Sequence, residues 1–429
     1  MRVDMISCLV TGLAIAATGA HALPKPSPLP VYKHKHVFPP RNIELGPRPE
    51  FLVHSMDAGA LKDKLTSCLE KKGDVTTTQF SIGHRGGAVL QFPEETLESH
   101  MAGIRMGAGI LECDVAFTKD LQFVCRHDQC DLHTTTNIVD TPLGAKCTTP
   151  FQPADPGKGK LARAKCCTSD ITLAEYKTLC GKMDGYNASA LTPADYLHGT
   201  PAWRTDLYAT CGTVLSHAEY MSFIASQGLL FTAELKQPRV SMPFQGTYTL
   251  DMYRQQLVDA YVRAGIPPEK VWLQSFVFED VAYWLKHAPE FGRQAILLDQ
   301  SGDAPGSSID DAAANLTFYK EAGVRIVGPP LQYLVSLDGE GDEYVPSTYA
   351  KTAKKLGLDV ITWSLERSGP LAQAARNGDY YYSTIANGTR KDGDMFRLLD
   401  VLGTQVGVKG IFSDWSATVS FYANCMGFS

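Results

Sequence analysis

Eight short apolar runs alternate with helical patterns between Gln79 and Asp414, and this alternation predicts an α/β fold, a (β/α)₈ barrel. A second observation is that charged and titratable side chains fall at the ends of several runs, where the loops of such a barrel begin. A third is that a long cysteine-rich stretch interrupts the alternation after the second run, which predicts an insertion there. The expected strands are Gln79–Gly83, Gly109–Val115, Leu229–Glu234, Lys270–Gln274, Gln294–Leu298, Val324–Gly328, Leu358–Trp363 and Val408–Asp414.

Helix start and stop signals fit the same alternation. Ser216 followed by Glu219 forms a capping-box pattern and predicts a helix that begins there. The segment Lys351–Leu356 ends before Gly357, a common helix stop. An open doubly wound sheet is the main alternative, but the chain lacks the glycine-rich dinucleotide loop that such a sheet usually carries.

The size and composition are those of a globular protein. The 429 residues are 44% hydrophobic and carry a formal net charge of -6. Single α/β barrels reach this length, so one barrel domain is expected. No strongly basic region suggests nucleic acid as a partner, and no apolar stretch beyond the N-terminus is long enough for a transmembrane segment. The sequence does not indicate an oligomeric state.

The N-terminal region is typical of a secreted protein. Residues 1–22 contain Arg2, an apolar stretch and an Ala-x-Ala end, which together predict a signal peptide. Leu23–Pro49 is rich in proline and contains Lys-His-Lys-His at residues 33–36. We interpret it as a linker or removable propeptide, with metal binding by the histidine pair as a minor alternative. The barrel domain is then expected to span residues 50–429.

The cysteines also indicate an oxidising compartment. The chain has 11, and removal of Cys8 with the signal peptide leaves an even number, which favours disulfides whose pairing the spacing does not define. A zinc site at Cys125, Cys130 and Cys147 is a weaker alternative, because no second close pair supports it. Three glycosylation sequons, at Asn187, Asn315 and Asn387, fit the secretory route.

The predicted insertion covers about residues 128–228, between His127 and Leu229. It is rich in cysteine, glycine and proline. Because structureless loops of that length are uncommon in compact domains, we expect disulfides to hold it together over the barrel mouth.

Two carboxylates, Glu112 and Asp114, lie one residue apart in the second apolar run. In a strand they share one face, while Cys113 points to the other. A pair of solvated acids at a strand edge is the simpler interpretation. The apolar sequence before the pair suggests a buried strand, however, and buried charges need a partner such as Ca²⁺ or Mg²⁺.

Two histidines frame this acidic pair, each at the end of an apolar run. His84 is followed by Arg85 and two glycines, and the guanidinium suits phosphate oxygens. His127 supplies a second group that can titrate near neutral pH. A lone histidine at a strand end is more often structural, but two of them beside an acidic pair predict acid/base chemistry.

Further polar and aromatic residues fall at the ends of later strands. Glu234 and Lys236 share one strand face, and Trp363 and Asp414 close two other runs. The carboxyl ends of barrel strands meet at one mouth, so we expect these residues to face the same pocket as His84. We expect Trp363 to form a wall of this pocket, and a core position, which is common for tryptophan, is the alternative.

The order of these motifs resembles the glycerophosphodiester phosphodiesterase family. It runs HRG, PE-x-T, E-x-D-V, T-K-D and V-x-R-H-D between His84 and Asp128. It continues as FTAELK at Phe231–Lys236, QSF at Gln274–Phe276, TWS at Thr362–Ser364 and GIFSDW at Gly410–Trp415. One departure is Glu95, where the family usually has asparagine.

The resemblance implies a secreted, metal-dependent enzyme that releases glycerol 3-phosphate and an alcohol, either through a cyclic phosphate or by direct attack of water. Related venom phospholipases D, which act on lysophospholipid or sphingolipid head groups, and a non-enzymatic cell-wall protein are the alternatives. The expected roles are catalysis by His84 and His127; substrate or phosphate binding by Arg85, Lys236 and Trp363; Ca²⁺ or Mg²⁺ binding by Glu112, Asp114 and Glu234; and support by Glu94.

Overall fold

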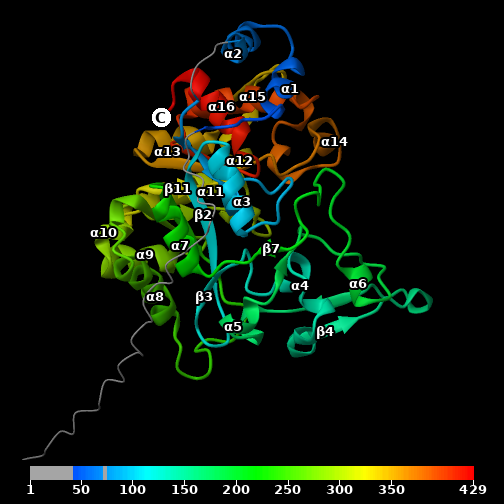
Figure 1. Cartoon of the computed structure of the whole chain (residues 1–429). Coiled ribbons are helices and arrows are strands. Elements are labelled where there is room, and N and C mark those ends of the chain that lie inside the picture. The colour runs from blue at the N-terminus through cyan, green and yellow to red at the C-terminus, as the bar shows by residue number, and fades with distance from the viewer. Residues whose placement is uncertain (1–41, 71–74) are drawn as a thin grey trace, which may run out of the picture.

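Eight parallel strands form a closed barrel in the computed structural model, which describes residues 42–70 and 75–429 (Figure 1). The barrel closes because β1 pairs in parallel with β15 on one side, at Ser81 and Ile411, and with β2 on the other. Each strand overlaps one of the eight predicted runs, so the predicted fold class is confirmed. In barrel order the strands are β1 (Thr78–Gly83), β2 (Ala108–Phe117), β8 (Leu230–Leu235), β9 (Val271–Ser275), β10 (Ile296–Leu298), β11 (Ile326–Gly328), β14 (Asp359–Leu365) and β15 (Gly410–Ser413).

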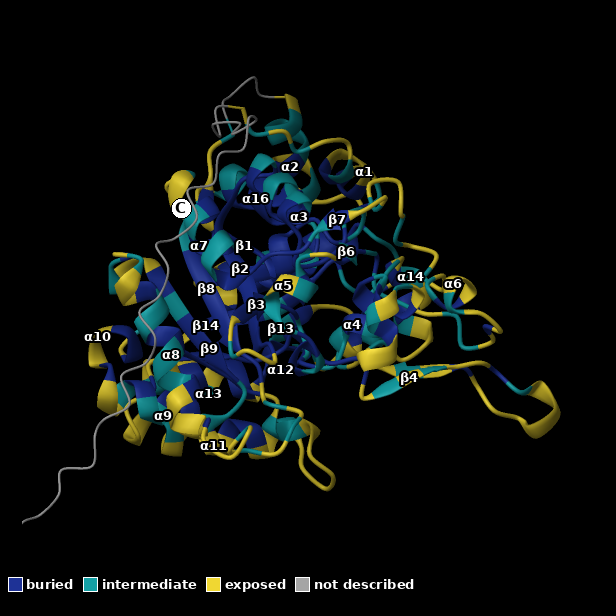
Figure 2. Ribbon diagram, turned by 60° about the horizontal axis from the view of Figure 1, so that its bottom comes forward, coloured by how far each residue is buried: buried dark blue, intermediate teal, exposed yellow. Residues whose placement is uncertain are grey.

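Alternate side chains of the strands build two apolar layers. One set fills the barrel interior and includes Ile82, Ile110, Ile296 and Phe412, all nearly fully buried. The other set packs against the surrounding helices, and Figure 2 shows the strands in the buried colour with exposed residues on the outer helices. The interior is therefore a packed core, and the loops at its mouth are where a ligand can bind.

One long helix follows each barrel strand, as the predicted alternation requires. The predicted capping box is present at α7, where the Ser216 side chain accepts from the Glu219 backbone and Glu219 accepts in return. The predicted stop is present at α13, which ends at Leu356 before a left-handed Gly357. These helices are α3 (Leu97–Arg105), α7 (His217–Ser226), α8 (Leu250–Arg263), α9 (Phe278–His287), α11 (Ile309–Glu321), α13 (Thr348–Leu356), α15 (Asp394–Asp400) and α16 (Ser416–Met426).

Shorter elements fill the connections between strands and helices. Within the described residues, no helix is long and apolar enough to cross a lipid bilayer. The short elements of the barrel loops are α10 (Pro289–Gly292), α12 (Leu331–Leu334), β12 (Val335–Leu337), β13 (Tyr344–Pro346) and α14 (Leu371–Arg376).

Two N-terminal helices precede the first barrel strand, and the first begins two residues before the expected start of the barrel domain at residue 50. The expected signal peptide and most of the expected linker lie outside the described residues. The end of that linker differs from the prediction, because α1 (Arg48–His54) starts inside it and α2 (Ala60–Glu70) follows. Pro49 misled the interpretation, since proline in the first turn of a helix loses no hydrogen bond. The Glu44 N–H also donates to the Arg105 carbonyl, which fixes this segment to α3.

The insertion leaves the barrel after β3 (Phe123–Cys125), which pairs antiparallel with β2. It ends before α7 and not at residue 228, because α7 is the helix that joins β2 to β8 and packs on both. Its short elements surround a separate small core that includes Leu132 and Tyr176, and Figure 1 shows them gathered beside the barrel. They are α4 (Leu132–Thr135), β4 (Thr149–Gln152), β5 (Arg163–Lys165), α5 (Leu173–Tyr176), β6 (Cys180–Gly181), α6 (Pro193–Tyr196) and β7 (Gly212–Thr213).

Disulfides hold the insertion, as predicted, and the zinc alternative is wrong. All three cysteines of that alternative are oxidised, so none can ligate a metal as a thiolate. The bridges are Cys68–Cys425, Cys113–Cys125, Cys130–Cys167, Cys147–Cys166 and Cys180–Cys211.

Candidate active site

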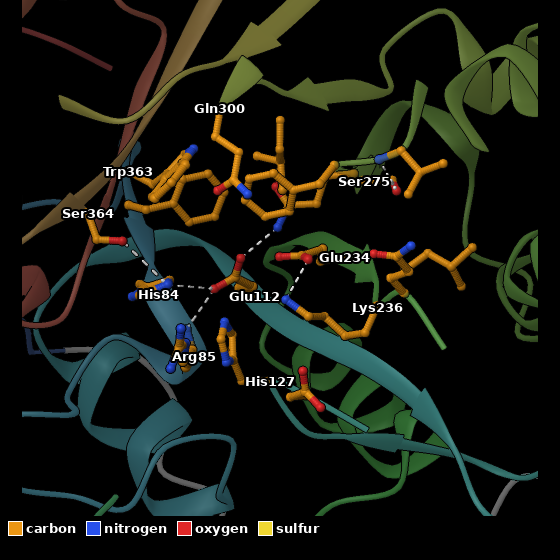
Figure 3. Close-up of a pocket in the computed structure, with 18 of the residues that line it drawn as sticks. His84, Arg85, Glu112, His127, Glu234, Lys236, Ser275, Gln300, Trp363 and Ser364 are labelled. Atoms are coloured by element: carbon orange, nitrogen blue, oxygen red, sulfur yellow. Dashed lines mark hydrogen bonds and ion pairs between the residues drawn. The ribbon is translucent and has the colours of Figure 1, made fainter. Parts of the chain in front are cut away.

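A cavity of about 440 Å³ lies at the mouth of the barrel, where the carboxyl ends of the strands meet. Seven of the nine predicted site residues line it, from segments that are far apart in the sequence (Figure 3). The other two, Glu94 and Asp114, are buried behind the wall and contact lining residues. The seven that line the cavity are His84, Arg85, Glu112, His127, Glu234, Lys236 and Trp363.

Three carboxylates form a compact cluster beside this cavity. Asp114 on β2 lies directly opposite Glu234 on β8, and Glu112 shares the β2 face with Asp114 as predicted. One carboxylate oxygen from each residue lies within 4.8 Å of the others. The three residues are at most 6% exposed, so water does little to screen their mutual repulsion.

The surroundings of the three carboxylates shift their pKa values in different directions. Burial raises the pKa of Glu112, and the nearby Asp114 charge raises it further. Burial likewise raises the pKa of Glu234, although Lys236 opposes the shift. For Asp114 burial would raise the pKa, but the attraction of Lys236 and then of Arg85 outweighs it and lowers the pKa. Both of its oxygens are nevertheless buried without a hydrogen-bond partner.

His84 is held in one orientation by Asp414, which follows β15. The His84 Nδ1 atom lies 2.5 Å from Asp414 Oδ1, so the carboxylate places the ring proton on Nδ1. The other ring nitrogen, Nε2, lies 3.4 Å from Ser364 Oγ and 3.8 Å from Glu112 Oε2. Burial lowers the pKa of His84 to about 4 against the opposing effect of Asp414, which leaves the imidazole neutral with Nε2 as an acceptor.

Arg85 packs against acidic residues directly behind the cavity. Its guanidinium Nη1 donates to both oxygens of Glu94, at 3.0 and 3.1 Å, and Nε lies 3.7 Å from Asp114. Its backbone N–H donates to Glu112. The second of the two glycines after Arg85, Gly87, allows close packing and not ligand approach, because a Cβ there would lie 2.3 Å from the Ser416 hydroxyl. Glu94 therefore supports Arg85.

His127 enters the cavity from the start of the insertion. Figure 3 shows it on the opposite side of Arg85 from His84. Burial, followed by the positive charges of Arg85 and Lys236, lowers the pKa of its imidazole well below the usual value. The site thus contains two imidazoles, both neutral before an anion binds.

Lys236 and Trp363 line the cavity from two different sides (Figure 3). Lys236 Nζ lies 2.5 Å from Glu234 Oε1 and 3.6 Å from Asp114 Oδ1. The Trp363 indole N–H donates to the Gly328 carbonyl, and its ring meets Phe276 edge-on. Trp363 is therefore a wall of the pocket, fixed by its own hydrogen bond.

Several residues of the site are absent from the predicted set. Gln274 donates to Glu112 at 2.6 Å, and Ser364 approaches His84; both stand inside the motif segments, which could have drawn attention to them. Arg204 and Arg367 both donate to Asp414 Oδ2. No local pattern distinguishes these two arginines, because only the tertiary fold brings them to Asp414.

Comparison with known proteins agrees with this geometry. The model of the glycerophosphoryl diester phosphodiesterase family matches residues 84–418. A protein of Arthroderma benhamiae named "Extracellular protein" is 51% identical over 244 residues, which are 57% of this chain and 99% of that protein. Glycerophosphodiester phosphodiesterase GDPD6 of Arabidopsis thaliana is 31% identical over 112 residues, 26% of this chain and 28% of its own length.

A solved structure shares the fold. The crystal structure of a candidate glycerophosphoryl diester phosphodiesterase from Silicibacter pomeroyi DSS-3 superposes with a TM-score of 0.50 at 19% identity, covering 85% of this chain and 99% of that one. Because the family model spans most of the chain and includes all the residues of the cavity, the protein belongs to the glycerophosphoryl diester phosphodiesterase family and is an enzyme of that class.

Proposed function

We propose that the protein is a secreted, metal-dependent phosphodiesterase that hydrolyses glycerophosphodiesters to glycerol 3-phosphate and an alcohol. The main observation in support of this proposal concerns Asp114. Its two oxygens are buried without a hydrogen-bond partner, although Lys236 and Arg85 lie 3.6 and 3.7 Å away, and they belong to a cluster with two further carboxylates next to the cavity that His84 and His127 line. Buried polar atoms without partners are costly, so a ligand for them is expected.

A divalent cation fits this set of donors. We propose that Glu112, Asp114 and Glu234 hold Ca²⁺ or Mg²⁺, both of which prefer oxygen ligands. When bound, such an ion stabilises the negative charge that grows on the phosphate in the transition state. Gln274 orients the Glu112 carboxylate, and Lys236 adds a positive charge beside the phosphate.

The two histidines divide the proton transfers between them. His84 accepts the proton of the attacking oxygen at Nε2, because Asp414 keeps the other nitrogen protonated. A bound diester offsets the charges of Arg85 and Lys236, which lower the pKa of His127. Substrate binding therefore favours protonated His127, which can then donate to the leaving oxygen. The attacking oxygen is either the neighbouring substrate hydroxyl, through a cyclic phosphate, or water.

Secretion and the domain boundaries complete the proposal. We propose that residues 1–22 are removed as a signal peptide, that the proline-rich stretch within Leu23–Pro49 that precedes the barrel domain is a linker or removable propeptide, and that the insertion shapes the pocket for the alcohol. The five disulfides support an oxidising compartment. The sequons at Asn315 and Asn387 are exposed, so both asparagines are accessible to glycosylation.

The test is release of glycerol 3-phosphate from glycerophosphocholine, with and without EDTA, by the wild type and by His84→Ala. A His287→Ala variant is the matched control, because His287 is exposed at the end of α9. We expect loss of activity on chelation, recovery with Ca²⁺ or Mg²⁺, and a fall in kcat of about 10²–10⁴-fold for His84→Ala only. Activity that resists EDTA would contradict the metal site. Hydrolysis of lysophosphatidylcholine alone would point instead to lipid head groups.

A further inference from the structure

A segment of the insertion, residues 203–208, lies against the mouth of the barrel. The Trp203 ring packs on Gly369 in the loop after β14, where a Cβ would lie 2.7 Å from the ring. The Thr205 N–H donates to the Leu90 carbonyl at 3.0 Å. The Tyr208 ring stacks on Phe92, with 4.8 Å between ring centroids. These three contacts fix the segment to loops that follow β1 and β14.

Arg204 extends from this segment toward the residues behind His84. Its guanidinium Nη2 donates to Asp414 Oδ2 at 2.9 Å, and the side chain is only 6% exposed. Arg367 donates to the same oxygen at 3.0 Å, while His84 contacts the other oxygen, Oδ1. Arg204 therefore meets the carboxylate that orients His84 without lining the cavity itself.

The two sides of the Asp414 carboxylate have different roles. Oδ1 fixes the imidazole of His84, and Oδ2 receives two guanidinium groups from separate parts of the chain. A carboxylate held on one side alone can rotate about its last bond, and the imidazole would follow it. Two donors from different directions restrict that rotation, because both must be broken before the plane can turn.

We propose that Arg204 is a positioning residue, which makes the insertion a working part of the active site. Arg204 holds Asp414, and Asp414 holds His84 with Nε2 facing the cavity. A purely structural tether would not need a buried guanidinium here, because Trp203 and Tyr208 already attach the segment. The inference rests on the proposed role of His84 in glycerophosphodiester hydrolysis.

The first test compares Arg204→Ala, Arg204→Lys and the control Arg163→Ala in the full-length protein. Arg163 is an exposed arginine of the same insertion. We expect kcat to fall about 10²-fold for Arg204→Ala, with KM changed by less than about threefold, because the imidazole is misplaced while substrate contacts remain. Arg204→Lys should retain part of the lost kcat, added guanidinium ion should partly rescue Arg204→Ala, and Arg163→Ala should match the wild type. Unchanged kcat for Arg204→Ala, or loss of kcat by Arg163→Ala to the same extent, would overturn the proposal.

A second variant and a spectroscopic measurement distinguish loss of positioning from misfolding and from an error in the proposed function. Trp203→Ala removes the packing on Gly369 while keeping the guanidinium. We expect Trp203→Ala to lower kcat as well, because Arg204 reaches Asp414 only while residues 203–208 stay packed against the barrel loops. ¹⁵N NMR of the His84 ring reports its hydrogen bond to Asp414 without any substrate. A wild type inactive on all diesters would reject the proposed function, whereas an unchanged His84 spectrum in folded Arg204→Ala would reject the positioning role.

Discussion

The barrel and the insertion keep their structure by different interactions. The barrel has eight paired strands and a continuous apolar core that reaches the surrounding helices. The insertion has strands of two to four residues, a much smaller core and three internal disulfides. Disulfides thus supply part of the stability of the insertion, whereas apolar burial stabilises the barrel. Each region nevertheless contributes a donor to Asp414, and the comparison can therefore be tested through both activity and stability.

The largest effect is expected at Asp414 itself. Asp414→Asn can turn its amide N–H₂ toward His84 and reverse which ring nitrogen carries the proton. We expect kcat for glycerol 3-phosphate release to fall on the order of 10³-fold, more than for any insertion variant. The exposed Asp359→Asn serves as the control. If Arg204→Ala costs as much as Asp414→Asn, the insertion and the barrel contribute equally, and the distinction between them fails.

Thermal unfolding should respond differently to a mutation in the barrel and to a mutation in the insertion. Ile296→Ala removes a fully buried side chain of the barrel interior and should destabilise the main unfolding transition by about 2–5 kcal/mol. Replacement of Cys147 and Cys166 by serine should loosen the insertion locally, which hydrogen exchange detects, and leave the main transition nearly unchanged. Equal lowering of one shared transition would mean that the two regions unfold together.

The pH dependence of stability offers a third test through His217 on α7. Burial lowers the pKa of this imidazole to about 3, whereas the unfolded chain titrates near 6.5. Above about pH 6.5 neither state is protonated, and between about 6.5 and 3 the unfolded state binds one more proton, so stability falls as the pH falls. The slope of unfolding free energy against pH should be steeper in the wild type than in His217→Phe by about 1.4 kcal/mol per pH unit. Equal slopes in the two proteins would show that His217 does not contribute to the pH dependence of stability.

The smallest effect is expected at Glu95, where the chain departs from the family pattern. Glu95 is fully buried, and burial followed by repulsion from Asp114 raises its pKa well above the usual range, which favours its neutral form. It also accepts from the Asp114 N–H. Glu95→Gln should therefore leave kcat and KM within about twofold of the wild type. A loss of tenfold or more would show that a charged or proton-donating Glu95 takes part in the site.

The sequence predicted the barrel and most of its mouth because the signals are local. Apolar runs mark strands wherever the two faces of a strand are buried. Reactive residues at the ends of such strands lie together at the mouth of a barrel, because the carboxyl ends of all its strands meet there. Pro49 was assigned to the linker although it lies in the first turn of α1, because proline marks both linkers and helix starts. The zinc alternative was wrong because spacing alone does not distinguish a metal ligand from half of a disulfide. Arg204 was missed since its contact with Asp414 joins residues that are 210 positions apart.

The bridge between Cys68 and Cys425 joins α2 to α16, near the two ends of the described chain. The polypeptide between them is thereby a covalent ring of nearly the whole domain. A protease that cuts one exposed loop inside this ring produces two polypeptides that the disulfide still joins, and no fragment is released. Such a nicked molecule keeps every strand attached to the same covalent body and can stay assembled until the disulfide is reduced.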